Sequence, residues 1–209
     1  MDIYSLVFSP IDVNTYILAV GGECCIIDCG CYDENEFSAL KSFLDEKNLT
    51  PVLLLNTHCH LDHIFGNRFM LSHYNLKSYS HILEEYNRKN SVKHAEIFGL
   101  RMEFPPEPAG FIEDNQEIKF SATSMTALHV PGHSPGGLAF YFEKEGFVFT
   151  GDALFAGSIG RSDLPGGNHE TLIKSINAKL FTLPESTVVY PGHGEKTDIK
   201  TEKQFNPYF

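Results

Sequence analysis

The chain has 209 residues, of which 42% are hydrophobic, and its 27 acidic and 16 basic side chains give a formal net charge of −11. A chain of this size can bury a substantial core, about two thirds of the surface exposed when unfolded, so we predict one domain over residues 1–209. The acidic balance argues against nucleic acid as a partner, because phosphate binding requires a basic face. No apolar run is long enough to span a membrane, so no membrane partner is expected either.

Cysteine usage and the first residues bear on the compartment. The cysteines number five, and Cys24, Cys25, Cys29 and Cys31 crowd one predicted strand and its turn. An adjacent pair and a Cys-Gly-Cys step make poor chelate geometry, so we interpret these thiols as small core residues. The first residues lack the basic region of a signal peptide. The sequence therefore predicts a cytoplasmic protein.

The first half of the chain indicates strands around a helix. Apolar runs predict strands over residues 3–8, 15–20, 24–28 and 51–56. Apolar side chains at helical spacing predict a helix over residues 34–47. Two further helices are expected over residues 81–89 and 94–103, and the proline-rich residues 105–108 then form a loop.

The second half repeats strands and then a helix. Strands are predicted over residues 117–120, 123–130, 138–142 and 148–150. Asn168 is expected to cap a helix that runs through Leu180. Two such halves predict an α/β (α+β) fold in which two sheets pack face to face with helices outside, an αββα sandwich.

The most informative stretch is residues 58–63, which directly follows the apolar run over residues 52–55. Alternate side chains of an extended loop point to the same side, so His58 and His60 are expected to chelate one point. Asp62 and His63 fall on the next bend, where they can serve a second point nearby. We therefore predict a metal site at the end of a buried strand.

Further candidate ligands follow other predicted strands. His133, Asp152 and His193 each lie in a glycine-containing turn at a strand end. Imidazole nitrogen and carboxylate oxygen suit zinc, with iron or manganese also possible, and these turns contain no cysteine for a closed thiolate site.

The number of candidate ligands exceeds what one tetrahedral ion needs and suits two ions that share a carboxylate. The spacing favours one ion on His58, His60 and His133, another on Asp62, His63 and His193, and a bridging Asp152. Each ion then keeps an open position, which is typical of catalytic sites, so we expect two Zn²⁺ per chain.

These residues also resemble the motifs of a known family. Residues 57–63 (Thr-His-Cys-His-Leu-Asp-His), 131–133 (Pro-Gly-His), 151–152 (Gly-Asp) and 191–193 (Pro-Gly-His) are similar, in order and spacing, to the successive motifs of the metallo-β-lactamase fold. Residues 154–163 resemble the short bacterial relatives of glyoxalase II, the hydroxyacylglutathione hydrolases. The resemblance implies the αββα fold, the same metal ligands, and hydrolysis of a small-molecule anionic thioester.

The resemblance also implies individual roles. Arg161 occupies the position of a basic substrate-binding residue, and Asp62 would orient the metal-bound hydroxide. Full-length glyoxalase II enzymes hold glutathione with a C-terminal helical segment, whereas sixteen residues follow His193 here, so activity toward glutathione carriers is expected to be weak.

Two alternatives stay open. One is a relative with the same fold, a persulfide dioxygenase that uses one Fe(II) at the positions matching His58, His133 and Asp152. The other is a non-catalytic metal-binding protein. The acyl group, the thiol carrier and the oligomeric state are not decided by the sequence.

The remaining polar residues have plainer interpretations. Asp28 ends a predicted strand without a neighbouring histidine, so we expect it to brace the site without binding metal. His129 is expected in the core or in support of the ligands. Surface positions are expected for His73, His81, His94 and His169.

Overall fold

Two six-stranded sheets form the centre of the computed structural model, which describes all residues from 1 to 209. The first sheet contains, in spatial order, β1 (Asp2–Phe8), β2 (Val13–Val20), β3 (Glu23–Ile27), β4 (Thr50–Leu55), β5 (Ser78–Ser80) and β6 (Gly110–Phe111). The second contains β14 (Thr197–Asp198), β13 (Val188–Pro191), β10 (Phe147–Gly151), β9 (Leu138–Phe142), β8 (Thr123–His129) and β7 (Glu117–Phe120). A small hairpin pairs β11 (Leu154–Phe155) with β12 (Ser158–Ile159).

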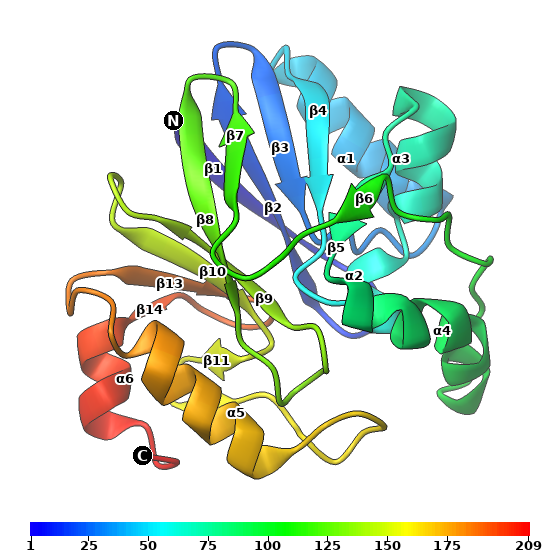
Figure 1. Ribbon diagram of the computed structural model, residues 1–209. Helices are drawn as coiled ribbons and strands as arrows, with labels where there is room; N and C mark the ends of the chain where they lie inside the picture. The colour runs from blue at the N-terminus through cyan, green and yellow to red at the C-terminus, as the bar shows by residue number, and fades with distance from the viewer.

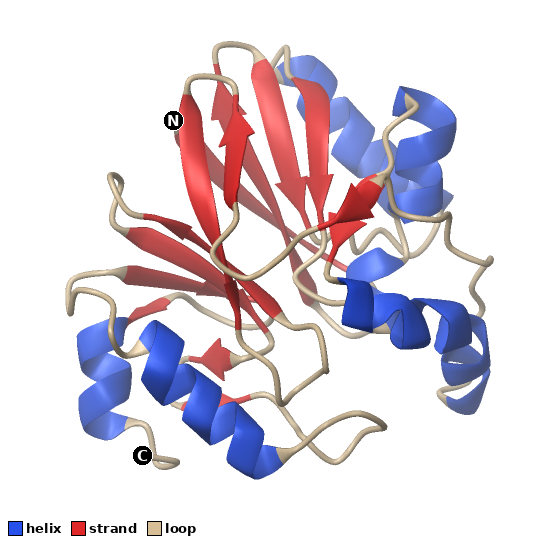
Figure 2. Cartoon of the chain, in the orientation of Figure 1, coloured by secondary structure: helices blue, strands red, loops and turns tan.

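Helices cover the outer face of each sheet (Figure 1). The first sheet carries α1 (Glu34–Glu46) and α3 (Asn67–Tyr74), and the second carries α5 (His169–Ser175), its π-helical extension Ile176–Leu180, and α6 (Ile199–Phe205). The short α2 (Leu61–Ile64), the 3-10 turn Ile82–Glu84 and α4 (Glu85–Ile97) lie at the end of the sandwich. The helix and strand layers in Figure 2 confirm the predicted αββα sandwich.

Apolar side chains fill the space between these layers. Leu18, Ile27 and Phe149 belong to a cluster that the inner faces of both sheets share. A second cluster joins the second sheet to the last two helices, and a third joins the first sheet to α1 and α3. Burial of these faces is the main favourable term in folding, and it fixes which strand ends lie at the same edge.

The two sheets contact each other along one edge. The strands that precede the candidate ligands end at this edge. Parallel pairing sets the carboxyl ends of β3 and β4 side by side in one sheet and those of β10 and β13 in the other. The Tyr16 hydroxyl donates to the Pro191 carbonyl at 2.7 Å, and the Asn14 N–H donates to the Gly192 carbonyl at 2.7 Å. Crevices beyond the carboxyl ends of strands are where α/β folds bind ligands.

The helices predicted over residues 81–89 and 94–103 are wrong in their boundaries. One helix, α4, runs from Glu85 to Ile97, because residues 89–94 contain no helix breaker. The helix ends where Gly99 takes a φ of 71° and the Leu100 N–H donates to the Ala95 carbonyl at 2.8 Å. A glycine in this left-handed conformation is a common helix stop. Residues 100–109 form an irregular loop in place of the second helix.

Two further predictions concern burial and membranes. All of the cysteines are free and buried, as expected for core residues. None of the helices combines the length and apolar character that a membrane crossing requires.

Candidate metal centre

The loop after β4 carries the first two candidate ligands. His58 is buried and His60 is half-buried, on a stretch of extended backbone that ends at the start of α2. The Leu138 N–H donates to the Thr57 carbonyl at 2.8 Å, which ties this loop to the opposite sheet. The loop therefore projects its histidines into the gap between the two sheets.

Asp62 and His63 lie on α2 itself, where the sequence predicted a bend. The side chains of both residues are buried. The short helix turns both side chains toward the gap, so the two ligand pairs of this stretch serve two neighbouring points.

The second sheet contributes His133, Asp152 and His193 from the turns after β8, β10 and β13. The turn after β13 needs glycine, because a Cβ at Gly192 would lie 2.2 Å from the Asp152 Oδ1 atom. The absence of a side chain there lets the His193 turn approach Asp152 closely.

The first predicted group comes together as a compact set of ring nitrogens. His58 Nε2 lies 3.2 Å from His133 Nε2, and His60 Nδ1 lies 2.8 Å from the same His133 atom. Ligand atoms around one tetrahedral zinc, each at about 2.0–2.1 Å, lie roughly 3.3 Å apart. These three histidines therefore have the arrangement that one ion requires.

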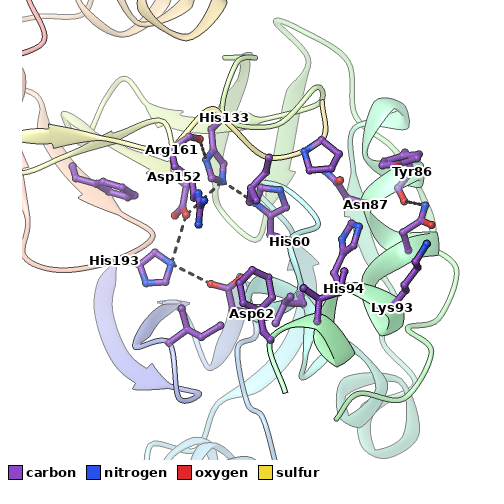
Figure 3. A pocket seen from close by; sticks show the side chains of 18 residues that line it. His60, Asp62, Tyr86, Asn87, Lys93, His94, His133, Asp152, Arg161 and His193 are labelled. Atoms are coloured by element: carbon purple, nitrogen blue, oxygen red, sulfur yellow. Dashed lines mark hydrogen bonds and ion pairs between the residues drawn. The ribbon is translucent and has the colours of Figure 1, made fainter. Parts of the chain in front are cut away.

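The second predicted group surrounds a neighbouring point. His193 Nε2 lies 3.2 Å from Asp62 Oδ2 (Figure 3). His63 Nε2 lies 3.5 Å from the same oxygen. Asp152 lies between the groups, with Oδ1 3.4 Å from His63 Nε2 and Oδ2 3.5 Å from His133 Nε2. A third overlapping set of His58, His63 and Asp152 links the two points. The structure thus gathers all the predicted ligands in the predicted division, while their role in binding metal stays a prediction.

Hydrogen bonds on the far side of each ring set the tautomers. His63 Nδ1 lies 2.9 Å from Asp28 Oδ2, and His133 Nδ1 lies 2.7 Å from the Arg161 carbonyl oxygen. His193 Nδ1 lies 3.0 Å from the Asp12 carbonyl oxygen. Since carbonyl and carboxylate oxygens only accept, each Nδ1 carries the proton and each Nε2 lone pair is free for a metal.

The pKa shifts differ between the two groups of candidate ligands. Burial and the neighbouring imidazoles lower the pKa of His58, and burial with His133 lowers the pKa of His60 to about 3. Burial opposes the charged form of Asp152, yet His63 and the other histidines hold its pKa below the usual value. Burial also opposes the charged forms of His63 and His193, but Asp62 and Asp152 raise the pKa of both imidazoles. Neutral imidazoles and ionised carboxylates are the protonation states that bind metals, so an ion at the second group would displace the proton that these carboxylates favour.

Two buried atoms indicate that the site suits a metal. His63 Nε2 and Asp152 Oδ1 are buried and have no hydrogen-bond partner. Leaving such atoms unpaired costs about 1–3 kcal/mol each, so buried polar atoms normally have partners. Both face the space between the two groups, where a cation would satisfy them.

A cavity of about 600 Å³ opens from these residues toward α4 (Figure 3). Arg161 lines it, but its guanidinium pairs with Asp163 at 2.8 Å and is about half exposed. The substrate-binding role of Arg161 therefore stays a prediction.

The other histidines divide between expected and unexpected positions. His73 and His169 are exposed, as predicted, and His129 binds the Pro135 carbonyl oxygen at 2.9 Å. The surface prediction for His94 is wrong, because this residue is half-buried and lines the cavity. His81 is also half-buried, since its ring stacks on His129 with centroids 4.4 Å apart.

Two contributors to the site were not found from the sequence. Glu84 is fully buried and accepts hydrogen bonds from the backbone of both histidine loops. Lys93 on α4 lines the cavity. Neither residue belongs to a motif, and only the fold brings them near the ligands.

Comparisons with known proteins agree with this geometry. The family model described as "Metallo-beta-lactamase superfamily" matches residues 9–193. The "Probable metallo-hydrolase YqgX" of Bacillus subtilis is 39% identical over 204 residues, which are 95% of this chain and 93% of that protein. The "Hydroxyacylglutathione hydrolase GloC" of Haemophilus influenzae is 36% identical over 190 residues, 88% of this chain and 85% of that protein.

Solved structures give the same picture. The "BLEG-1 B3 metallo-beta-lactamase" superposes with a TM-score of 0.91 at 32% identity, covering 99% of both chains. "TTHA1623 in a di-iron-bound form" gives 0.89 at 34% identity, covering 99% of this chain and 100% of that one. "ETHE1 from Myxococcus xanthus" gives 0.78 at 25% identity, covering 99% of this chain and 84% of that one. From the fold, the clustered ligands and these relatives, we conclude that the chain belongs to the metallo-beta-lactamase superfamily and resembles metal-dependent hydrolases.

Proposed function

We propose that this protein is a dinuclear metal-dependent hydrolase of small hydroxyacyl thioesters, glyoxalase II-like in its chemistry. The observation that carries the proposal is Asp152, whose two oxygens face His63 and His133 from opposite groups. A carboxylate that lies between two groups of ligands would help to hold an ion in each of them. Zinc is the proposed metal, and the di-iron form of one structural relative makes iron a realistic second choice.

Two such ions, when bound, make hydroxide available at neutral pH and polarise a carbonyl oxygen. The side chains of the site hold the reacting groups in position. Asp62 is held by His193 and His63, so its carboxylate can accept a hydrogen bond from the attacking water and orient it. The water oxygen forms a bond to the acyl carbon, the carbon–sulfur bond breaks, and the products are a carboxylic acid and a thiol. A thiolate leaves readily, which fits a site without a dedicated general acid.

The substrate is proposed to be a small anionic thioester that enters through the cavity beside α4. A cavity of about 600 Å³ lies in the range used for small ligands, roughly 300–1,000 Å³. The relative in Haemophilus influenzae acts, by its name, on hydroxyacylglutathione. A cytoplasmic location stays part of the proposal and follows from the cysteine content.

The proposal is tested without oxygen. We expect thiol release from S-lactoylglutathione or a smaller hydroxyacyl thioester in an anaerobic assay, with weak turnover of the glutathione carrier. A parallel oxygen-electrode assay with glutathione persulfide tests the mononuclear Fe(II) alternative. Oxygen uptake without anaerobic thiol release would replace the hydrolase with the dioxygenase.

Two further controls complete the assay. A β-lactam belongs in the substrate panel, because one structural relative is a B3 metallo-beta-lactamase. Loss of thioester turnover after metal chelation, with recovery on adding zinc, would exclude a non-catalytic metal-binding protein.

A further inference from the structure

The cavity at the metal centre has a second wall that the candidate ligands do not explain. Helix α4 and the residue that caps its end contribute a set of side chains that we call the α4 wall: Tyr86, Asn87, Asn90, Lys93, His94, Ile97 and Phe98. Four of these positions, 86, 90, 93 and 97, recur at the three- and four-residue spacing that places side chains on one face of a helix. Figure 3 shows Lys93 and His94 on the helix that faces the histidine cluster.

The α4 wall combines exposed apolar side chains at its two ends with the polar side chains of Asn90, Lys93 and His94 between them. Tyr86 is 54%, Ile97 71% and Phe98 53% exposed, whereas Arg88, Ser91 and Ala95 elsewhere on the helix are buried. Leu61 and Phe155 add apolar surface to the same cavity, and the Phe155 ring centroid lies 6.2 Å from that of His193. A substrate that reaches from the metals to α4 would therefore cover apolar surface.

The charges on the cavity wall are unequal. Arg161 pairs with Asp163 at 2.8 Å. The other cations of α4, Arg88 and Lys89, lie outside the cavity and pair with Glu85. Lys93 has no ion-pair partner. Lys93 is thus the cation of the cavity that is free to meet an anion on the substrate.

We propose that the α4 wall is the subsite for the thiol-carrier arm of the substrate, and that it favours an apolar arm ending in a carboxylate or similar anion that meets Lys93. This inference rests on the proposed thioester hydrolysis. Glutathione has two carboxylates and an ammonium group, whereas the α4 wall offers one free cation and no carboxylate. The preferred carrier is therefore less polar than glutathione.

The experiment compares thioesters that have the same acyl group but different thiol-carrier arms. Lactoyl thioesters of 3-mercaptopropionate and 6-mercaptohexanoate are assayed beside their neutral primary amides, with wild type, Lys93→Met and Arg161→Met. We expect Lys93→Met to raise KM for the longer carboxylate by roughly threefold to fivefold, the range for an exposed ion pair. KM for the amide and kcat should not change. Lys89→Met, on the same helix but outside the cavity, should match wild type.

Apolar contact is tested separately with Ile97→Ser. Wild type should show a lower KM for the longer arm, and this advantage should shrink in the variant. The inference is overturned if Arg161→Met, and not Lys93→Met, removes the preference for carboxylate. It is also overturned if Ile97→Ser changes only the oligomeric state, since the wall would then be an interface between copies.

The experiment distinguishes failure of the proposed subsite from failure of the proposed reaction. If wild type hydrolyses no thioester, the proposed function fails, and the subsite is tested by calorimetric binding of the matching thioethers, which cannot be hydrolysed. Weaker binding of the carboxylate thioether to Lys93→Met, with the amide unchanged, would support the subsite even then. Equal binding to both proteins would refute it.

A separate observation concerns the buried carboxylate of Glu84. Its Oε2 accepts from the Cys59 N–H at 2.8 Å and its Oε1 from the Gly136 N–H at 2.7 Å. Asn87 Nδ2 adds a third hydrogen bond at 2.9 Å. Cys59 lies between His58 and His60, and Gly136 lies three residues after His133. One side chain therefore ties together the two loops that carry the first group of ligands.

We infer that Glu84 is a positioning residue for the first metal site. Its charge matters because all of its contacts are N–H donors. In Glu84→Gln the side-chain amide turns a donor toward one of them, so one loop loses its anchor. Loss of a group that orients metal ligands typically costs about 10–100-fold in metal affinity.

Glu202 supplies a matched control. It is also buried, and it accepts from the Gly157 N–H at 2.9 Å, from Thr197 at 2.6 Å and from Asn206 at 2.7 Å. It holds the β11–β12 hairpin and the start of β14 against α6, and it contacts neither loop of the first ligand group. A purely structural loss should therefore look the same in both Gln variants.

The readouts are the Tm of the metal-free proteins and zinc affinity by chelator competition. We expect both variants to lose Tm, and only Glu84→Gln to weaken one of the two zinc ions, by about tenfold or more. Unchanged zinc affinity in Glu84→Gln, or an equal loss in Glu202→Gln, would overturn the inference. If Glu84→Gln does not fold, Glu84→Asp, which keeps the charge but is too short to reach both loops, takes its place.

Discussion

Asp28 shows how one carboxylate organises several ligands. It accepts hydrogen bonds from the Thr57 N–H at 2.8 Å and the Thr57 hydroxyl at 2.6 Å, and it contacts His63 Nδ1 at 2.9 Å. The sequence predicted a bracing role, and these contacts confirm it. The Thr57 hydroxyl also lies 3.1 Å from His58 Nδ1, so Asp28 orients both histidines of the overlapping third set.

The bridging position of Asp152 makes its replacement decisive. Asp152→Ala removes the oxygens that face His63 and His133, so we expect a lower metal content and no measurable turnover. His73→Ala should change neither, because His73 is exposed on α3 and contacts only local groups and Phe37. Metal analysis and thioester assays on both variants check this. Equal effects of the two substitutions would refute the ligand assignment.

The His133 turn depends on close packing against α5. A Cβ at Gly132 would lie 2.2 Å from the Leu172 backbone nitrogen, and Gly132 has a φ of 130°. Gly132→Ala therefore combines backbone strain with a clash against a helix, for which we expect a loss of about 3 kcal/mol or more in the free energy of unfolding. The displaced turn should also lower zinc occupancy.

Comparison with Gly146→Ala separates the cost of backbone strain from that of a steric clash. Gly146 has a φ of 74° but open space around its missing Cβ, so strain alone should cost roughly 1–2 kcal/mol. Its hairpin lies away from the ligands, so zinc content should not change. Urea unfolding of the metal-free proteins and metal analysis measure both effects. Similar losses in the two variants would show that packing against α5 is unimportant.

Long apolar strands and the turns after them could be predicted from the sequence, because buried strands have a strong local pattern. The short strands β5 and β6 could not. Each has only a few residues, and pairing with neighbouring strands, such as Tyr79 with Gly110, holds them in place. The helix α3 was missed for a similar reason, since its apolar contacts with α1 and the first sheet come from the tertiary fold.

The residues of the candidate site also fall into those that the sequence pattern located and those that only the fold brings together. His58, His60, Asp62 and His63 are close in sequence, and His133, Asp152 and His193 follow strands, so local signals located them. The contacts of Glu84 and the α4 wall join segments far apart in the chain. No local pattern encodes such contacts, because the meeting of α4 with both histidine loops is set by sheet packing.

The net charge of the whole protein and the charge beside the metal centre have opposite effects on an anionic substrate. The chain has a formal charge of −11, yet Lys93, a cation without an ion-pair partner, lines the cavity beside the metal centre. Bound cations would add further positive potential there. An anionic substrate is thus attracted locally, although the overall field of the protein is unfavourable.

The metal centre should also stabilise the whole fold, because its ligands come from both sheets and from α2. We expect the purified protein to hold close to two transition-metal ions per chain after growth with zinc and iron. An ion at a thousand times its Kd contributes about 4.1 kcal/mol. For a chain of this size, each kcal/mol raises Tm by about 2–4 °C, so removing one ion should lower Tm by about 8–16 °C. Stepwise chelation followed by calorimetry tests this, and Asp152→Ala, which lacks the bridge between the sheets, should show a smaller shift. A metal content of one or none, or a Tm that does not respond to chelation, would contradict a dinuclear centre that joins the two sheets.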